Sequence, residues 1–234
     1  MISISPDRFA QGMTFDEYVA FMATPENLRR EGSGGAPRVD RSEFFRQAFA
    51  DARLTDAQTA ALEWLVAQPN GPAKMLVISE EWSSDCRRAV PMFARMATVS
   101  GMQLRIFPRD GQKFSTANVP SLADAPDSNA DLMAQFLNHK NGQTFQSIPV
   151  CAFFSDRMEC LYHFTEYPAI YDKDRLVMQH IRAPRPGESA DETRARADRE
   201  FGELMASPFW QIWTSATIDE ILTSLHDRLI LGAP

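Results

Sequence analysis

Cysteine is the residue type in this chain best suited to covalent chemistry, and Cys86 is the cysteine best placed for it. The chain has three cysteines and no Cys-x-x-Cys pattern. The other two, Cys151 and Cys160, lie far from Cys86 in the sequence. An apolar run at 75–79 predicts a buried strand, and the spacing at 84–99 predicts a helix that has Cys86 in its first turn. The dipole and free N–H groups of such a turn favour a thiolate.

The neighbours of Cys86 have opposing effects on its expected reactivity. Ser83, three residues earlier, is well placed to cap the helix. Arg87 and Arg88 would lower the pKa of the thiol, whereas partial burial and Asp85 would raise it. Two alternatives stay open: an inert, semi-buried cysteine under a simple serine cap, or a monothiol that forms mixed disulfides or is oxidised.

The remaining polar candidates favour structural roles. Cys151 and Cys160 are expected to pack in the core as small apolar residues, with Cys160 opposite Phe153 across a turn at 156–157, so that a bridge between them is not expected. Glu80 and Glu81 would point in opposite directions on an extended segment, which predicts solvated charge rather than shared acid–base work. No zinc site, other metal site or cofactor is predicted, because no metal-ligand spacing includes the four histidines, His139, His163, His180 and His226.

Strands and helices alternate over residues 73–181. The predicted strands are 75–79, 103–108, 148–154 and 159–164, and the predicted helices are 84–99, 129–138 and 168–180. A strand–helix–strand unit followed later by an antiparallel hairpin and a covering helix implies an α/β fold with a mixed sheet and helices on both faces.

Helical extensions flank this domain on both sides. Residues 1–72 carry the capping boxes Thr14/Glu17 and Thr55/Gln58, a further helix after Ser42, and a glycine-rich connector at 31–37. Residues 182–234 carry capping boxes at Ser189/Glu192 and Thr217/Glu220, with an aromatic group between them at 209–213. We expect the last helix to pack on the domain, the alternative being that its aromatic patch meets a partner.

The turn before the predicted helix at 84–99 resembles the active-site turn of the thioredoxin superfamily, Trp-Cys-x-x-Cys. Trp82, Asp85 and Cys86 match in register, and the sequence is more similar still to a bacterial thioredoxin-like family with a Trp-Cys-Gly-Asp-Cys turn and an added N-terminal helical region. Pro91 stands where thioredoxins have a helix proline. Ile148-Pro149 stands where the superfamily has a cis-proline that faces the active site.

The departures from this pattern affect the chemistry. Ser83 occupies the position of the nucleophilic first cysteine, Ser84 replaces the glycine, and the buried carboxylate of thioredoxins would fall on Val77. A serine hydroxyl cannot form a mixed disulfide, and the dithiol cycle needs a thiolate to attack and a second thiol to resolve the intermediate. General disulfide reduction is therefore not expected.

The resemblance implies a site built from Cys86 and Ser83, with substrate or partner contacts from Trp82, Ser84, Asp85, Ile148 and Pro149. The leading hypothesis is a protein of thiol-redox ancestry that acts as a monothiol protein in cell redox homeostasis. The alternative is a redox-inactive module that binds a protein or peptide by strand addition at the cis-proline groove. A thiol transferase of the glutathione type is a weaker third possibility, because no second helical domain of the expected length follows.

Composition limits the classes of partner and the cellular compartment that we expect for this chain. The formal net charge of −7 argues against nucleic-acid binding and against anionic membranes. No apolar run reaches the roughly 18 residues of a membrane span, and Asp7 and Arg8 interrupt the region where a signal peptide would be apolar. The expected address is the cytoplasm.

Overall fold

The computed structural model describes residues 2–140 and 142–232 and divides into two compact units. The sheet unit comprises Met1–Glu166 and Ile221–Pro234, and the helical unit comprises Tyr167–Glu220. These units do not follow the expected divisions after residues 72 and 181. The first 72 residues share the core of the sheet unit, since helices from this region pack on the strands and on the helix that follows the first strand.

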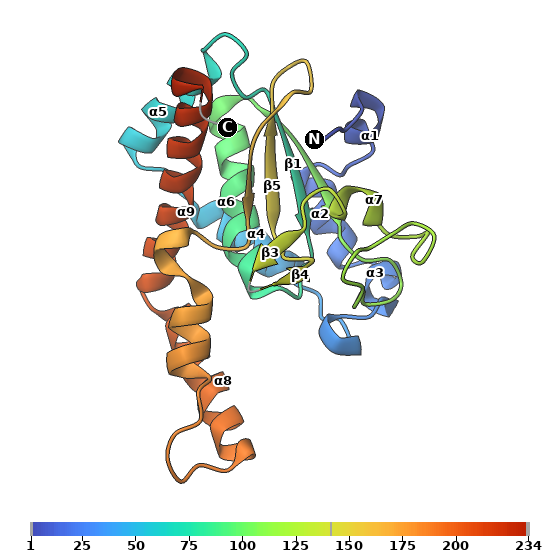
Figure 1. Ribbon diagram of the computed structural model, residues 1–234, viewed down its shortest axis with the longest axis vertical. Coiled ribbons are helices and arrows are strands. Elements are labelled where there is room, and N and C mark those ends of the chain that lie inside the picture. The colour runs from blue at the N-terminus through green and yellow to red at the C-terminus, as the bar shows by residue number, and fades with distance from the viewer. Residues whose placement is uncertain (1, 141, 233–234) are drawn as a thin grey trace. The chain divides into compact units, whose positions relative to one another are not determined.

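A four-stranded mixed sheet forms the centre of the sheet unit (Figure 1). Its order is β2-β1-β5-β6, with β1 and β2 parallel and the other pairs antiparallel. The bounds are Lys74–Ser79 for β1, Gln103–Pro108 for β2, Val150–Phe154 for β5 and Cys160–Thr165 for β6. This arrangement confirms the predicted fold class and the four predicted strands. All of β5 and all of β1 after Lys74 are buried, as the continuous apolar runs require.

The helix α6, Ser84–Ser100, packs on β1 and β2 and directs its N-terminus toward the end of β1. Gly101 ends this helix in the left-handed conformation (φ 76°), which a residue without a Cβ adopts at little cost. The helix starts directly after the turn that follows β1. The turn is therefore fixed at both ends by regular structure.

The N-terminal helices begin where the capping boxes predict. Thr14/Glu17 and Thr55/Gln58 both form reciprocal capping boxes, at the starts of α2 (Phe15–Met22) and α5 (Asp56–Val66). The other elements of this region are α1 (Pro6–Ala10), α3 (Pro25–Arg29), the 3-10 turn η1 (Ser33–Gly35) and α4 (Ser42–Asp51). Ser42 is the first residue of α4 rather than its cap.

The predicted helix at 129–138 is wrong for most of its length. Only α7, Ala130–Met133, is helical, and a two-stranded sheet of β3 (Asn138–Lys140) and β4 (Gln143–Phe145) follows it. Leu132 and Phe136 are buried although the helix ends between them. Their apolar spacing therefore reflects burial rather than a continuous helix.

The hairpin of β5 and β6 differs from the prediction by one residue. Phe154, not Phe153, pairs with Cys160, because a register shift lies between Phe153 and Phe154. All three cysteines are free, in agreement with the expected absence of a Cys151–Cys160 bridge. The bulge could not be read from the alternation of apolar residues.

The last part of the chain is helical but not as predicted. In place of a helix at 168–180 there are a 3-10 turn η2 (Ala169–Tyr171) and a π-helix η3 (Asp174–Ile181). The Ser189/Glu192 capping box opens α8 (Ala190–Ala206) as predicted, whereas Thr217 lies inside a continuous α9 (Phe209–His226), which η4 (Asp227–Leu231) extends. The Thr217 hydroxyl donates to the Trp213 carbonyl one turn back instead of capping a helix.

Of the helices in the described residues, none combines the length and the apolar character that a membrane span requires.

Candidate functional site

The candidate site is the turn Glu80–Cys86 between β1 and α6. Ser83 is the N-cap of α6, and its hydroxyl accepts a hydrogen bond from the backbone N–H of Cys86 at 3.4 Å. The Cys86 side chain is 0% exposed and Ser83 is 8% exposed. The residue at the position of the first cysteine therefore serves to start the helix, and the residue at the second position lies beneath it.

Burial determines the acidity of the Cys86 thiol. It raises the pKa of Cys86 to about 11, although hydrogen bonds from Ser79, from the Glu80 backbone and from Ser83 act in the opposite direction. The Tyr18 hydroxyl of α2 donates to the Ser79 hydroxyl at 3.0 Å, so the N-terminal helices contribute to the environment of the thiol. Burial also raises the pKa of Tyr18 well above its usual range, with Glu81 and Glu80 adding to the effect.

Asp85 and Arg88 pair with each other instead of acting on the thiol from solvent. Arg88 Nη1 lies 3.0 Å from Asp85 Oδ1, and both side chains are buried. Arg88 Nη2 also donates to the Glu166 carbonyl at 3.0 Å, just after β6. Asp85 thus helps to orient an arginine that ties α6 to the far strand of the sheet.

Trp82 is half-buried and lies beside a second aromatic ring. Its ring meets Phe114 edge to face at 5.6 Å between centroids, and the Arg109 guanidinium lies 5.3 Å from Trp82 and 5.2 Å from Phe114. Arg109 Nη1 donates to the Gln146 carbonyl at 3.0 Å. The tryptophan is thereby connected to the segment that leads into Pro149.

The Ile148–Pro149 peptide bond is cis, and both residues are buried. Glu166 N–H donates to the Pro149 carbonyl at 2.8 Å, continuing the pairing of β5 with β6. Among residues 2–140 and 142–232, the backbone N–H and C=O of Ile148 have no hydrogen-bond partner. Trp82 and Ser84 are the partly exposed members of the predicted set, while Ser83, Asp85, Cys86, Ile148 and Pro149 lie beneath the surface.

The prediction of solvated charge at Glu80 and Glu81 is wrong. Their side chains are 0% and 2% exposed, and both accept hydrogen bonds from Arg38, at 2.6 Å for Glu80 and 2.8 Å for Glu81. The two carboxylates converge because both residues lie beyond the end of β1, in a turn, where the alternation of an extended strand no longer applies. Burial would lower the pKa of Arg38, but Glu80 and Glu81 together raise it.

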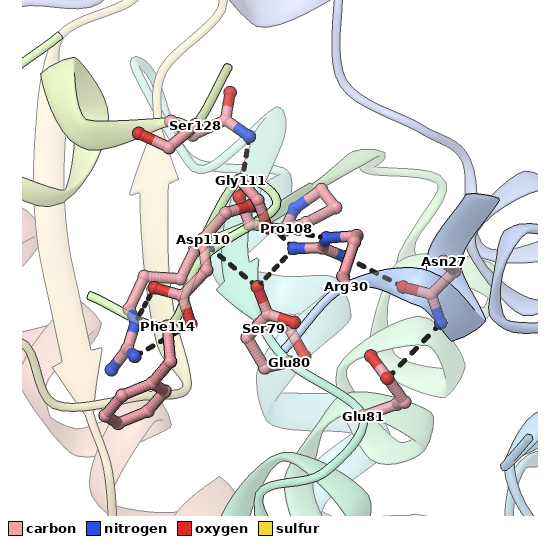
Figure 2. A network of polar contacts seen from close by, with 12 residues as sticks. Asn27, Arg30, Ser79, Glu80, Glu81, Pro108, Asp110, Gly111, Phe114 and Ser128 are labelled. Carbon is pink, nitrogen blue, oxygen red and sulfur yellow. Dashed lines mark hydrogen bonds and ion pairs between the residues drawn. The ribbon is translucent and has the colours of Figure 1, made fainter. Parts of the chain in front are cut away.

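Arg30 and Asn27 complete the network around these carboxylates, as Figure 2 shows. Arg30 Nη2 lies 2.8 Å from Glu80 Oε1, and Arg30 Nη1 donates to Asn27 Oδ1 at 2.8 Å. Asn27 Nδ2 in turn donates to Glu81 at 3.3 Å. Two arginines and one asparagine from the segment 27–38 therefore hold both acidic residues of the turn.

The same network reaches the end of β2. Glu80 accepts the backbone N–H of Asp110 at 2.7 Å, and Arg30 donates to the carbonyls of Asp110 and Gly111 at 2.6 and 3.0 Å. The Asp110 carboxylate receives two hydrogen bonds from Arg109, each 2.9 Å long. Burial, with a contribution from Glu80, nevertheless raises the pKa of Asp110.

Sequence reasoning did not identify Asn27, Arg30 and Arg38 as members of the site. Arg38 and Glu80 are 42 positions apart, and no motif connects them. An arginine next to a glycine-rich connector carries no signal for burial, because most arginines are exposed.

No group of three or more His, Cys, Asp and Glu side chains in the described part of the chain is arranged to hold a metal ion. The site consists of a capped helix start, a buried thiol, and a partly exposed Trp82–Phe114 surface above buried ion pairs.

Comparisons with known proteins identify similarity over the region that includes the turn. Residues 42–124 match the family model described as Thioredoxin. A crystal structure of a protein of unknown function from Pseudomonas aeruginosa is similar at a TM-score of 0.47 and 15% identity, covering 96% of this chain and 98% of that one. A crystal structure of an HIV epitope-scaffold is similar at a TM-score of 0.47 and 14% identity, covering 99% and 100% of the two chains. No curated protein matches the chain.

Proposed function

We propose, on the match of residues 42–124 to the Thioredoxin family model, that this chain is a binding module of the thioredoxin fold that performs no thiol–disulfide exchange. A protein or peptide partner would contact the surface around Trp82 and Ser84, with Ile148 and Pro149 beneath it. The leading alternative, a monothiol redox protein, requires a reactive Cys86 thiolate.

The burial of Cys86 is the observation that carries the proposal. The side chain is 0% exposed and its pKa is raised to about 11. At pH 7 only about one Cys86 thiol in ten thousand would be ionised, and a buried thiolate could not reach the sulfur of a second molecule. Ser83 above it has no thiol and is engaged as a helix cap.

The expected contact surface follows from exposure and from unpaired backbone groups. Trp82 and Phe114 are partly exposed and form an aromatic pair. Tryptophan in particular contributes strongly to the binding energy of protein interfaces. The unpaired backbone groups of Ile148 would suit an extended peptide that adds as a strand, once the side chains above them move aside. Asp85 and Arg88 would support this surface from below.

The absence of thiol chemistry is tested by alkylation of Cys86 with iodoacetamide between pH 5 and 10, read by peptide mass spectrometry. We expect Cys86 to be modified far more slowly in the folded protein than in urea, and more slowly than the half-buried Cys160. We also expect no reduction of insulin disulfides with dithiothreitol. Rapid modification of Cys86 with a midpoint well below about 8.5 would contradict the proposal and favour the monothiol alternative.

The Ser83→Cys variant tests whether the missing first thiol is all that prevents disulfide reduction. We expect a disulfide between the new residue and Cys86 to form on oxidation, because the two positions are one helical turn apart, and insulin reduction to become detectable. Intact mass under oxidising and reducing conditions measures the first effect. If native protein already reduces insulin, the assignment of the turn is wrong.

The contact surface is tested by selecting displayed random peptides on the native protein and measuring the affinity of the purified peptides. Trp82→Ala should weaken binding at least tenfold, whereas Cys86→Ser should leave it unchanged. Trp64→Ala is the matched control, because Trp64 is a 47% exposed tryptophan of α5 outside the site. Peptides that lose affinity for Trp64→Ala but not for Trp82→Ala would place the binding surface elsewhere.

A further inference from the structure

The glycine-rich connector 31–37 turns back on itself in the sheet unit. Gly32 N–H donates to the Ala36 carbonyl at 2.7 Å. This turn brings Glu31 and Arg38 together, and the Glu31 carbonyl accepts a hydrogen bond from Arg38 Nε at 3.1 Å. Because Arg38 is itself held by the two buried carboxylates of the candidate turn, Glu31 has a fixed position relative to that turn.

The aromatic ring of Phe114 lies on a long irregular loop. Between the end of β2 and the start of α7, residues 109–129 form turns and bends but no helix or strand. Loops longer than about 12–15 residues are uncommon in compact domains and usually have a function. Phe114 nevertheless meets Trp82 edge to face. Regular secondary structure does not fix this ring, so other contacts must hold it beside the tryptophan.

Glu31 holds the loop at Phe114 itself. Glu31 Oε2 accepts the Phe114 N–H at 3.1 Å, and Glu31 Oε1 accepts a hydrogen bond from Lys113 Nζ at 2.7 Å. The Glu31 N–H donates to the Gln112 carbonyl at 2.9 Å. Hydrogen bonds from Lys113 and from the Phe114 N–H lower the pKa of Glu31, so the carboxylate is ionised at neutral pH. Three successive loop residues are therefore attached to one glutamate.

Gln146 holds the next part of the same loop. Its Nε2 donates to Ser115 Oγ and to the Ala117 carbonyl, both at 2.7 Å. Gln146 belongs to the segment that leads into the cis peptide bond. The loop is thus attached up to Phe114 by Glu31 and after it by Gln146, and Glu31 is the residue that binds the backbone of Phe114 directly.

We propose that Glu31 is a positioning residue of the peptide surface, which holds Phe114 against Trp82 before a partner binds. This inference rests on the proposed function, because it makes the aromatic pair a preformed contact for a protein or peptide. A ring that is already held in place loses less conformational freedom on binding, so affinity increases without a new contact. Loss of Glu31 would release the ring of Phe114, whereas Trp82 would stay in the short turn between β1 and α6.

The affinity experiment uses the peptides selected on the native protein as probes, with calorimetry as the measurement. Glu31→Ala should weaken binding about fivefold, the effect of having to order one side chain on binding. Glu31→Gln keeps an oxygen that can accept the Phe114 N–H and should recover most of the loss. The matched control is Glu26→Ala, which removes an exposed carboxylate of α3 that has no hydrogen bond or ion pair to the loop among the described residues, and it should leave the affinity unchanged.

A double-variant cycle separates positioning from a general loss of stability. In Phe114→Ala, the further change Glu31→Ala should leave the affinity within about 1.5-fold, because the ring that Glu31 positions is absent. An equal loss with and without Phe114 would overturn the proposal. So would an unchanged affinity in Glu31→Ala when Trp82→Ala weakens the same peptide. No effect of Trp82→Ala would instead contradict the proposed function.

Hydrogen exchange tests the position of Phe114 without a partner. The Phe114 N–H should exchange at least about tenfold faster in Glu31→Ala than in the native protein, and Glu26→Ala should resemble the native protein. In the native protein, which needs no variant to fold, the Phe114 N–H resonance should follow the titration of Glu31, with a midpoint below the ordinary value of 4.5. Equal protection in a folded Glu31→Ala, or a resonance that does not follow Glu31, would overturn the proposal.

Discussion

Two arginine-centred ion networks in this chain use the same chemistry in different surroundings. Arg38 holds Glu80 and Glu81 at 2.6 and 2.8 Å in the sheet unit, and Arg196 holds Glu188 and Glu200 at 2.6 and 3.3 Å in the helical unit. The carboxylates of the first are 0% and 2% exposed, whereas those of the second are 20% and 24% exposed. The distances are similar, but the stability of the fold should depend more strongly on the arginine of the first network. Water can replace a lost partner only in the second network.

The two networks also differ in how their members are related along the chain. Arg196 and Glu200 are four residues apart on α8, and Arg196 also binds the carbonyls of Ile181 and Ala183 within the same unit. Arg38 reaches its partners across more than 40 positions. The Arg196 pairing organises one local segment, whereas the Arg38 pairing fixes an N-terminal segment to the turn of the candidate site.

The largest expected effect is the loss of Arg38. Arg38→Met should lower the free energy of unfolding by about 3–5 kcal/mol, because it leaves buried carboxylates without their main partner. Urea denaturation measures the effect. Arg196→Met is the matched control in the network whose carboxylates are partly exposed, and it should lower the free energy of unfolding by clearly less.

A compensating change sharpens this result. Adding Glu81→Gln to Arg38→Met removes one of the stranded charges, while Glu80 keeps Arg30, so the double variant should be more stable than Arg38→Met alone. If Arg38→Met costs no more than Arg196→Met, burial does not separate the two networks.

An intermediate effect is expected at alkaline pH. The pKa of Cys86 is raised to about 11 in the folded state from an ordinary value near 9. The folded protein therefore keeps a proton that the unfolded chain releases, and the free energy of unfolding falls as pH rises from 9 to 11, by roughly 3 kcal/mol for this thiol. Unfolding measured across this window should fall less steeply in Cys86→Ala, and an equal slope in both proteins would contradict the assignment.

The smallest effect is expected at acidic pH in the partly exposed network around Arg196. Hydrogen bonds from Arg196 lower the pKa of Glu188 to about 2 from an ordinary value near 4.5. The stabilisation is present above pH 4.5 and is lost as pH falls toward 2. Carboxyl ¹³C NMR should follow this titration, and Arg196→Met should return the pKa toward 4.5. A Glu188 that already titrates near 4.5 in the native protein would show that the pair contributes nothing in solution.

Local patterns predicted much of the fold. The capping boxes at Thr14, Thr55 and Ser189 each mark a helix start, because a hydroxyl and a carboxylate or amide three residues apart satisfy the first free N–H groups wherever they occur at such a start. Thr217 has the same spacing and fails, since the helix has already begun at Phe209 and leaves no free N–H to cap. A capping signal is therefore reliable only where the preceding chain is not helical.

The candidate turn was placed by sequence, but its environment was not. The capping role predicted for Ser83 and the register of Cys86 follow from adjacent residues in one turn. Tyr18 binds Ser79, whose hydroxyl acts on the Cys86 thiol, and Arg30 and Arg38 pair with the buried carboxylates of Glu80 and Glu81. None of Tyr18, Arg30 and Arg38 is near the turn in sequence.

The sequence by itself determined the four strands of a mixed sheet, the helix that starts at Ser84, and the replacement of the first active-site cysteine by Ser83. Only the tertiary structure decided that the remaining thiol is shielded with its pKa raised, and that two adjacent glutamates are buried rather than solvated. The physical reason is that hydrogen-bonding patterns of strands and helix caps are set within a few residues. The cost of burying a charge depends on which distant side chains the fold brings to it.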